Sequence, residues 1–242
     1  MPTDSLLGGT ASTPHLILWD VDHTLVRIGG GTSQTIYARA FEDITGRPLG
    51  PLADMAGRTD QAILAETLRL NGIEMPEALF GDFYAALAAA ADQIADHMRE
   101  VGTVLPGARE AIAMCAAQNH VQSAVTGNIR PIAMAKLAAL NLDDVLDFTV
   151  GGYGDDGSDR AELVHRARMR ASEKYGQDFA AGRTVVVGDT PHDVRGALDA
   201  GAVAVAVASG GSTAEELRHA GADIVLADLK DFTSRCGEVL GW

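Results

Sequence analysis

An apolar run that ends in two aspartates constrains this chain more than any other stretch. Residues 16–19 (Leu-Ile-Leu-Trp) are followed by Asp20, Val21 and Asp22, with Thr24 just beyond. A continuous apolar run is typical of a strand buried on both faces of a parallel sheet that has helices on each side. The two aspartates then lie at the carboxyl end of that strand, where open α/β sheets bind their ligands.

The spacing of the two aspartates makes them a candidate functional site. Because side chains alternate along an extended chain, Asp20 and Asp22 are expected on the same side. Two negative charges that close repel each other unless a cation or a proton lies between them.

Strand and helix patterns alternate through the second half of the chain. Apolar runs predict strands at 121–125, 148–150, 184–187, 203–207 and 224–226. Helices are predicted at 105–119, 131–140 and 160–175, from Thr190-Pro191 to Gly201, and after a capping box that begins at Ser212. This alternation predicts an α/β fold with a doubly wound parallel sheet.

The segment from 32 to 101 shows no strand pattern. It contains helix patterns at 33–45, at 59–72 and in an alanine-rich stretch from Pro76 to Glu100. Residues 26–32 are glycine-rich and are interpreted as a flexible connection. We therefore predict an α/β core of residues 1–31 and 102–242, with an inserted all-helical domain over 32–101.

Polar side chains follow several of the predicted strands. If the strands are parallel, their carboxyl ends meet at one edge of the sheet. The residues concerned are Asp20, Asp22, Thr126, Asn128, Arg160, Asp189 and Asp193. Each motif alone has a structural explanation as a surface turn or a helix cap, but their joint occurrence in this order is far more specific.

Four of these motifs resemble those of the haloacid dehalogenase (HAD) superfamily of hydrolases. Residues 20–25 (Asp-Val-Asp-His-Thr-Leu) resemble its first motif, 125–128 (Val-Thr-Gly-Asn) its second, and 188–193 (Gly-Asp-Thr-Pro-His-Asp) its fourth. The third motif is a lone Lys or Arg, which we place at Arg160. The resemblance implies a Rossmann-like core.

The resemblance extends over the chain from Leu16 onward. The helical insertion is similar to the C1 cap of the superfamily, and the chain looks closest to the phosphoglycolate-phosphatase-like branch. Two departures stand out. His23 occupies a position where glycine is usual, and Arg160 is not the lysine followed by proline that is common in this branch.

The resemblance also implies a mechanism of phosphoryl transfer. Asp20 would attack phosphorus and form an aspartyl-phosphate, and Asp22 would protonate the leaving oxygen and then activate water. Thr126 and Arg160 would bind the oxygens of the transferred group, helped by backbone amides such as that of Gly127.

The resemblance further implies a metal ion and a substrate contact. Mg²⁺ prefers oxygen ligands, which would come from Asp20, the backbone carbonyl of Asp22, and Asp189, with Asp193 as a ligand or directly behind the ligands. Asn128 would orient the substrate or Asp20.

The choice of Arg160 rests partly on elimination. A cation at a helix start is disfavoured by the helix dipole, so a purely structural role would favour an acidic residue. Lys136 and Lys174 fall inside predicted helices away from the strand ends, and Lys230 lies beyond the last motif. Arg130 is the alternative cation.

Three further residues have two open interpretations each. Arg58, in a loop before a predicted helix, resembles the substrate-specificity loop of the family, but it is equally compatible with a solvated arginine. His23 and His192 either line the cleft or, with the carboxylates, hold a transition metal. The oxygen-rich site favours Mg²⁺ and the first interpretation.

Particular residues also discriminate among the reactions of the superfamily. The acid at Asp22 argues against a dehalogenase, and the absence of any lysine before Lys136 argues against a phosphonatase. A phosphatase acting on a small phosphorylated metabolite remains, with a sugar phosphomutase of the β-phosphoglucomutase type as the alternative. A catalytically idle phosphate- or metal-binding protein is disfavoured, because an idle site gains nothing from clustered carboxylates.

Composition limits the possible partners. A formal net charge of −14 opposes binding to the phosphate backbone of nucleic acids. No secretory signal and no apolar run long enough to span a bilayer are found, so a cytoplasmic protein without a membrane partner is expected. Cys115 and Cys236 are expected as buried free thiols. The sequence does not indicate an oligomeric state.

Overall fold

The core of the protein is a five-stranded parallel sheet with the strand order β4-β1-β5-β6-β7. The structure is a computed structural model that describes residues 13–74, 76, 80–232, 234, 235 and 237. The strands are β1 (Leu16–Trp19), β4 (Val121–Ala124), β5 (Thr184–Gly188), β6 (Val203–Val207) and β7 (Ile224–Leu226). The parallel α/β architecture predicted from the sequence is confirmed.

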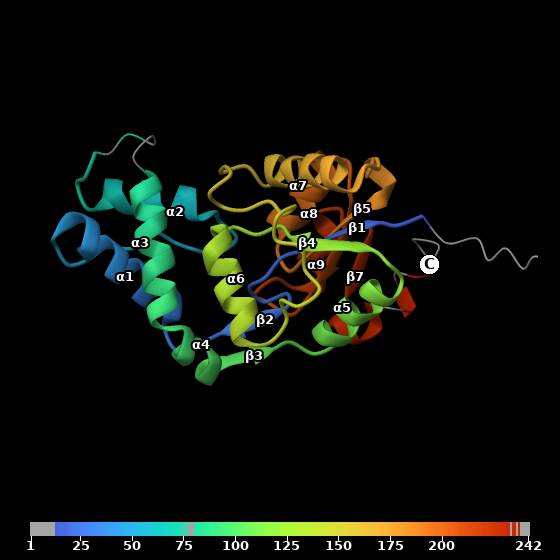
Figure 1. Ribbon diagram of the computed structural model, residues 1–242, viewed down its shortest axis with the longest axis horizontal. Coiled ribbons are helices and arrows are strands. Elements are labelled where there is room, and N and C mark those ends of the chain that lie inside the picture. The colour runs from blue at the N-terminus through green and yellow to red at the C-terminus, as the bar shows by residue number, and fades with distance from the viewer. Residues whose placement is uncertain (1–12, 75, 77–79, 233, 236, 238–242) are drawn as a thin grey trace, which may run out of the picture.

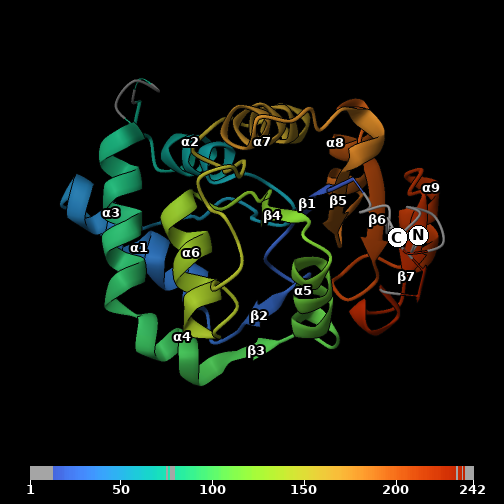
Figure 2. The same cartoon turned by 45° about the vertical axis from the view of Figure 1, so that its right-hand side comes forward.

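Alternating side chains of the strands bury both faces of this sheet. Ile17 and Trp19 belong to the apolar cluster on one face, whereas Leu16 and Leu18 belong to the cluster on the other. Helix α5 (Ala108–Ala117) covers the first face. Helices α7 (Arg160–Tyr175), α8 (Pro191–Asp199) and α9 (Ala214–His219) cover the second (Figures 1 and 2).

The strand register brings the predicted site residues to one edge. Trp19, the last residue of β1, pairs with Ala124 of β4 and with Val187 of β5. The three strands therefore end at nearly the same level, and the residues that follow them emerge side by side.

Four helices that lie between β2 (Val26–Ile28) and β3 (Gly102–Val104) along the chain form a separate group, which we call the cap helices. They are α1 (Thr32–Thr45), α2 (Asp60–Leu70), α3 (Phe80–Gln93) and α4 (Ala95–Val101). Helix α6 (Arg130–Ala139) lies between the cap helices and the sheet (Figure 2). Its residues Ile132 and Ala139 belong to the apolar cluster of the cap helices, and Ala133 and Leu137 to that of the sheet.

Several local predictions differ from the structure. Residues 26–28 are not a flexible connection but strand β2 (Val26–Ile28), which pairs antiparallel with β3 (Gly102–Val104) at the base of the cap helices. A strand needs a partner, and this partner lies far along the chain. The helix predicted from Pro76 to Glu100 is two helices interrupted at Ile94. Pro76 is not helical, and 77–79 lie outside the described residues.

The strand predicted at 148–150 is a turn, because the side chain of Asp147 accepts hydrogen bonds from the backbone N–H and the hydroxyl of Thr149. Such a local bond competes with strand pairing.

Three further predictions concern a helix cap, the cysteines and the membrane. The capping box of α9 begins at Thr213 and pairs with Glu216, one residue later than predicted. Cys115 is buried, as predicted, whereas Cys236 lies outside the described residues. Among the described helices, none is long and apolar enough to cross a membrane.

Two buried histidines meet at the end of the sheet opposite to the polar strand ends. The backbone N–H of His15 donates to Nδ1 of His120 at 3.1 Å, and the two rings lie edge to face with centroids 5.2 Å apart. Burial, and then the neighbouring His15, lowers the pKa of His120 to about 4.

The low pKa of His120 predicts that the protein loses stability in acid. Between pH 6.5 and about 4 the unfolded histidine is protonated and the folded one is not, so unfolding takes up a proton and becomes easier as the pH falls. One such proton contributes at most about 1.4 kcal/mol per pH unit. Urea unfolding across this range should show a smaller pH slope for His120→Asn, whose Oδ1 replaces the acceptor, than for wild type. The exposed His219→Asn is the control, and equal slopes for all three proteins would contradict the prediction.

Candidate active site

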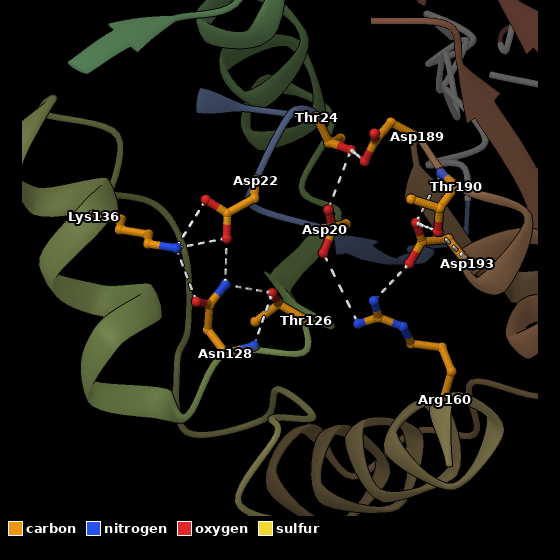
Figure 3. Close-up of polar contacts among 10 residues, drawn as sticks. All are labelled: Asp20, Asp22, Thr24, Thr126, Asn128, Lys136, Arg160, Asp189, Thr190 and Asp193. Atoms are coloured by element: carbon orange, nitrogen blue, oxygen red, sulfur yellow. Dashed lines mark hydrogen bonds and ion pairs between the residues drawn. The ribbon is translucent and has the colours of Figure 1, made fainter. Parts of the chain in front are cut away.

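Three buried carboxylates meet at the carboxyl ends of the strands. Asp20 follows β1, Asp189 follows β5, and Asp193 lies in the first turn of α8. One oxygen from each lies within 4.8 Å of those of the other two, and the residues are 5%, 3% and 1% exposed, respectively. Figure 3 shows them facing one another.

The start of helix α8 aims one oxygen of Asp193 at this cluster. Thr190 caps the helix, and its backbone N–H and hydroxyl both donate to Oδ2 of Asp193, at 3.1 and 2.7 Å. In return, the backbone N–H of Asp193 donates to the threonine hydroxyl. Because this capping box holds Oδ2, Oδ1 remains free of the cap and faces Arg160.

The electrostatics of the cluster favour a bound cation. Burial first, and then the charge of Asp193, raises the pKa of Asp20 well above its usual value, against the opposing effect of Arg160. The same two causes raise the pKa of Asp189 to about 7. Oδ1 of Asp193 is buried without a hydrogen-bond partner. An all-oxygen donor set with an unsatisfied buried acceptor suits a hard divalent cation.

Arg160 is the cation beside this cluster. It is the first residue of α7, and its Nη1 and Nη2 lie 3.9 Å from Oδ1 of Asp20 and 3.1 Å from Oδ1 of Asp193. The contact of Nη1 at 3.9 Å is too long for a hydrogen bond, so Nη1 is a buried donor without a hydrogen-bond partner. Its stem crosses α8 at Gly196, where a Cβ would lie 2.4 Å from Cγ of Arg160. Arg130, the alternative from the sequence, is exposed.

Asp22 lies on the other side of Asp20, in a second polar network. Nδ2 of Asn128 donates to Oδ2 of Asp22 at 2.7 Å and to the hydroxyl of Thr126 at 3.0 Å. Nζ of Lys136 donates to both carboxylate oxygens of Asp22, at 2.8 and 2.6 Å, and to Oδ1 of Asn128 at 2.9 Å (Figure 3). Burial raises the pKa of Asp22, but the charge of Lys136 and the hydrogen bonds from both neighbours outweigh it and lower the pKa overall.

Lys136 is the site residue that the sequence reasoning missed. Its predicted place on a helix is right, but its predicted distance from the strand ends is wrong, because its side chain, 2% exposed, reaches Asp22. The sequence does carry a signal. Positions 132, 133, 136 and 137 fall on one face of α6, and all four are buried. A lysine on an otherwise apolar face requires a buried partner.

The loop before α2 reaches the site from the cap helices. A Cβ on Gly127 would lie 2.1 Å from the carbonyl oxygen of Arg58, so only glycine permits this close approach. The guanidinium of Arg58 donates to the backbone carbonyls of Asp54 and Ala62, within its own loop and helix. It also lines, with the site residues, a cavity of about 920 Å³.

Asp60 joins the cap helices to the core at this loop. It is 3% exposed, and its carboxylate accepts hydrogen bonds from the hydroxyl of Tyr37 at 2.6 Å and from the backbone N–H of Ile129 at 2.7 Å. Burial raises its pKa against these two bonds. The sequence indicated only that a helix begins here.

The two histidines beside the motifs are not part of the carboxylate cluster. His192 and His23 both line the cavity. His23 has a left-handed backbone with φ of 63°, which explains why a glycine suits this position. Its carbonyl accepts a hydrogen bond from the hydroxyl of Ser209.

Comparisons of the sequence indicate a family. The family model described as haloacid dehalogenase-like hydrolase matches residues 17–198. A protein of Dickeya dadantii (strain 3937), named "Probable phosphatase IndB", is 28% identical over 131 residues. These residues are 52% of this chain and 52% of that protein, so the match spans about half the length of the relative.

Comparisons with solved structures show the same fold. A hydrolase from Pseudomonas syringae superposes with a TM-score of 0.65 at 23% identity, over 94% of this chain and 99% of the other. A predicted phosphatase from Clostridium acetobutylicum gives 0.65 at 17% identity, over 94% and 100%. A proposed beta-phosphoglucomutase from Bacteroides vulgatus gives 0.61 at 18% identity, over 94% and 89%.

The backbone of His23 predicts a stabilising substitution. A residue with a Cβ in the left-handed region destabilises the folded state by about 1–2 kcal/mol. Glycine avoids this cost, but part of the gain is lost because glycine has more conformational freedom in the unfolded chain. We expect His23→Gly to raise the free energy of unfolding by about 0.5–1 kcal/mol. Chemical denaturation measures this, with His23→Ala as the control that removes the ring but retains the strain. Equal stabilities for the Gly and Ala variants would contradict the prediction.

The carboxylate cluster predicts stabilisation by a divalent cation. At about 100 times its dissociation constant, one bound Mg²⁺ stabilises the folded state by about 2.7 kcal/mol, which corresponds to an increase in Tm of about 5–10 °C. Asp189→Asn should lose most of this increase in a thermal melt with Mg²⁺ or EDTA. Asp199→Asn, at the exposed end of α8, should retain it. The same increase in both variants would place the cation elsewhere.

Proposed function

The chain belongs to the haloacid dehalogenase-like hydrolase family, and from this premise we propose that it is a Mg²⁺-dependent phosphatase acting on a small phosphorylated metabolite. The observation that carries the proposal is the placement of Asp20. Its buried carboxylate belongs to the carboxylate cluster, with Asp189, Asp193 and Arg160 on one side and Asp22 on the other. A nucleophile, a cation for the phosphoryl oxygens and a proton carrier are the groups that phosphoryl transfer requires.

In the first step, a carboxylate oxygen of Asp20 bonds to phosphorus while the bond from phosphorus to the ester oxygen breaks. The incoming phosphoryl group provides the acceptors that the buried Nη1 of Arg160 lacks. The hydroxyl of Thr126, 1% exposed, would donate to the same group, helped by the backbone amide of Gly127. The product of this step is an aspartyl-phosphate on Asp20.

Asp22 carries the proton in both steps. It gives a proton to the departing ester oxygen, and it then takes one from the water that attacks phosphorus and releases Asp20. The carboxyl group of Asp22 thereby returns to its protonated starting state, and one ester and one water give one alcohol and one phosphate.

Asp20, Asp189 and Asp193, with the carbonyl of Asp22, would hold the Mg²⁺. When bound, the ion neutralises the repulsion between the carboxylates and the charge of the phosphoryl group.

The cavity supports a small substrate. Its volume of about 920 Å³ lies within the range of pockets that bind small molecules. Besides Lys136 and Arg160, its wall includes Arg27 and Arg58. Their positive charge would attract anionic groups on the part of the substrate that leaves.

Phosphate release tests the proposal. Purified protein is assayed on a panel of sugar, glycerol and carboxylic-acid phosphates and on 4-nitrophenyl phosphate, with Mg²⁺ or EDTA. We expect Mg²⁺-dependent release that Asp20→Asn reduces by at least about 10³-fold, because the nucleophile is lost. Asp199→Asn is the matched control. Interconversion of sugar 1- and 6-phosphates without phosphate release would favour a mutase, and no turnover of any ester would contradict the proposal.

A further inference from the structure

Lys136 is a buried cation on a helix face that is otherwise apolar. Its neighbours on that face, Ala133 and Leu137, pack into the core of the sheet, and the side chain of Lys136 is 2% exposed. Burial of an ammonium group is unfavourable unless it is fully paired, and a paired charge seldom stabilises a fold more than an apolar side chain does. Stability alone therefore does not explain a lysine at this position.

All three hydrogen-bond donors of the ammonium group are used. Two go to the carboxylate of Asp22, at 2.8 and 2.6 Å, and the third goes to Oδ1 of Asn128, at 2.9 Å. Because a lysine can only donate, it fixes the orientation of the Asn128 amide. The oxygen of that amide faces Lys136, and its nitrogen must face Asp22, to which it donates at 2.7 Å.

The result is a carboxylate held by three hydrogen bonds. Both Lys136 and Asn128 donate to Oδ2 of Asp22, whereas Oδ1 receives a bond from Lys136 alone. Oδ1 therefore has the greater remaining capacity for a proton. Figure 3 shows that this arrangement lies apart from Arg160, which faces Asp20 and Asp193. The two cations thus pair with different carboxylates, Arg160 with Asp20 and Asp193, and Lys136 with Asp22.

We propose that Lys136 is a positioning residue for proton transfer, which holds Asp22 where it can protonate the leaving oxygen of the ester. The inference rests on the proposed phosphatase function and adds a residue to it. It makes a specific prediction. Loss of Lys136 should slow the hydrolysis of esters whose leaving group needs a proton, and it should largely spare the hydrolysis of esters whose leaving group does not.

The test is a leaving-group series. Alkyl phosphates and phenyl phosphate have basic leaving oxygens, and 4-nitrophenyl phosphate has a weakly basic one. General acid catalysis contributes about 10²–10⁴-fold where it is needed, so Lys136→Met should lower kcat/KM for alkyl phosphates by about 10²-fold or more. For 4-nitrophenyl phosphate the loss should stay below about 10-fold. Lys174→Met, an ion-paired lysine with a side chain 48% exposed, should leave both rates unchanged.

A double-mutant cycle shows whether Lys136 acts through Asp22. In an Asp22→Asn background, Lys136→Met should produce little additional loss on alkyl phosphates, because the group that it positions is already gone. Thermal melts compare the folding of each variant with wild type. If Lys136→Met does not fold, Lys136→Gln, whose amide retains N–H donors, is measured on the same series and should show the same selectivity to a smaller degree.

Two results would overturn the inference in distinguishable ways. An equal loss on all esters in a folded Lys136 variant, with wild type active, would make Lys136 a structural residue and leave the phosphatase proposal intact. Absence of turnover by wild type on every ester would overturn the phosphatase proposal and this inference together.

Discussion

Mutual repulsion among Asp20, Asp189 and Asp193 is the constraint on which this site depends. Their oxygens lie within 4.8 Å of one another in a buried position, so something must hold them against their charge. The parallel register of β1 and β5 fixes the first two, and the capping box of α8 fixes the third. Arg160 supplies the counter-charge on the protein side. In the proposed function, relief of this repulsion is what would favour binding of a cation at the cluster.

The site divides its positive charge between two helices on opposite sides of Asp20. Arg160 begins α7 and faces Asp20 and Asp193, whereas Lys136 comes from the middle of α6 and faces Asp22. Helix α6 also contributes to the apolar cluster of the cap helices. The helix that holds the candidate proton carrier is thus the one on which the cap helices pack. Asp60 links the loop beside the cavity to the start of α6, because its carboxylate accepts a hydrogen bond from the backbone N–H of Ile129.

Much of the fold follows from local patterns. Apolar runs indicated all five strands of the main sheet, and helix α7 begins and ends where its periodicity indicated. The motif residues meet as expected, because parallel strands in register end at one edge. The errors fall where a distant or a side-chain partner decides the structure. Strand β2 exists only because β3 pairs with it, and residues 148–150 turn because of the side chain of Asp147.

The strands of the main sheet, the order of the motifs and the carboxylates after the strands were predictable from the sequence, because a few neighbouring residues encode each of them. Packing between distant segments was needed to bring Lys136 to the site, to turn Arg160 rather than Arg130 toward Asp20, and to place Asp60 between two parts of the molecule. Lys136 and Asp22 are 114 positions apart, and no local periodicity encodes the partner of a buried charge. That partner is set by how α6 packs against the sheet.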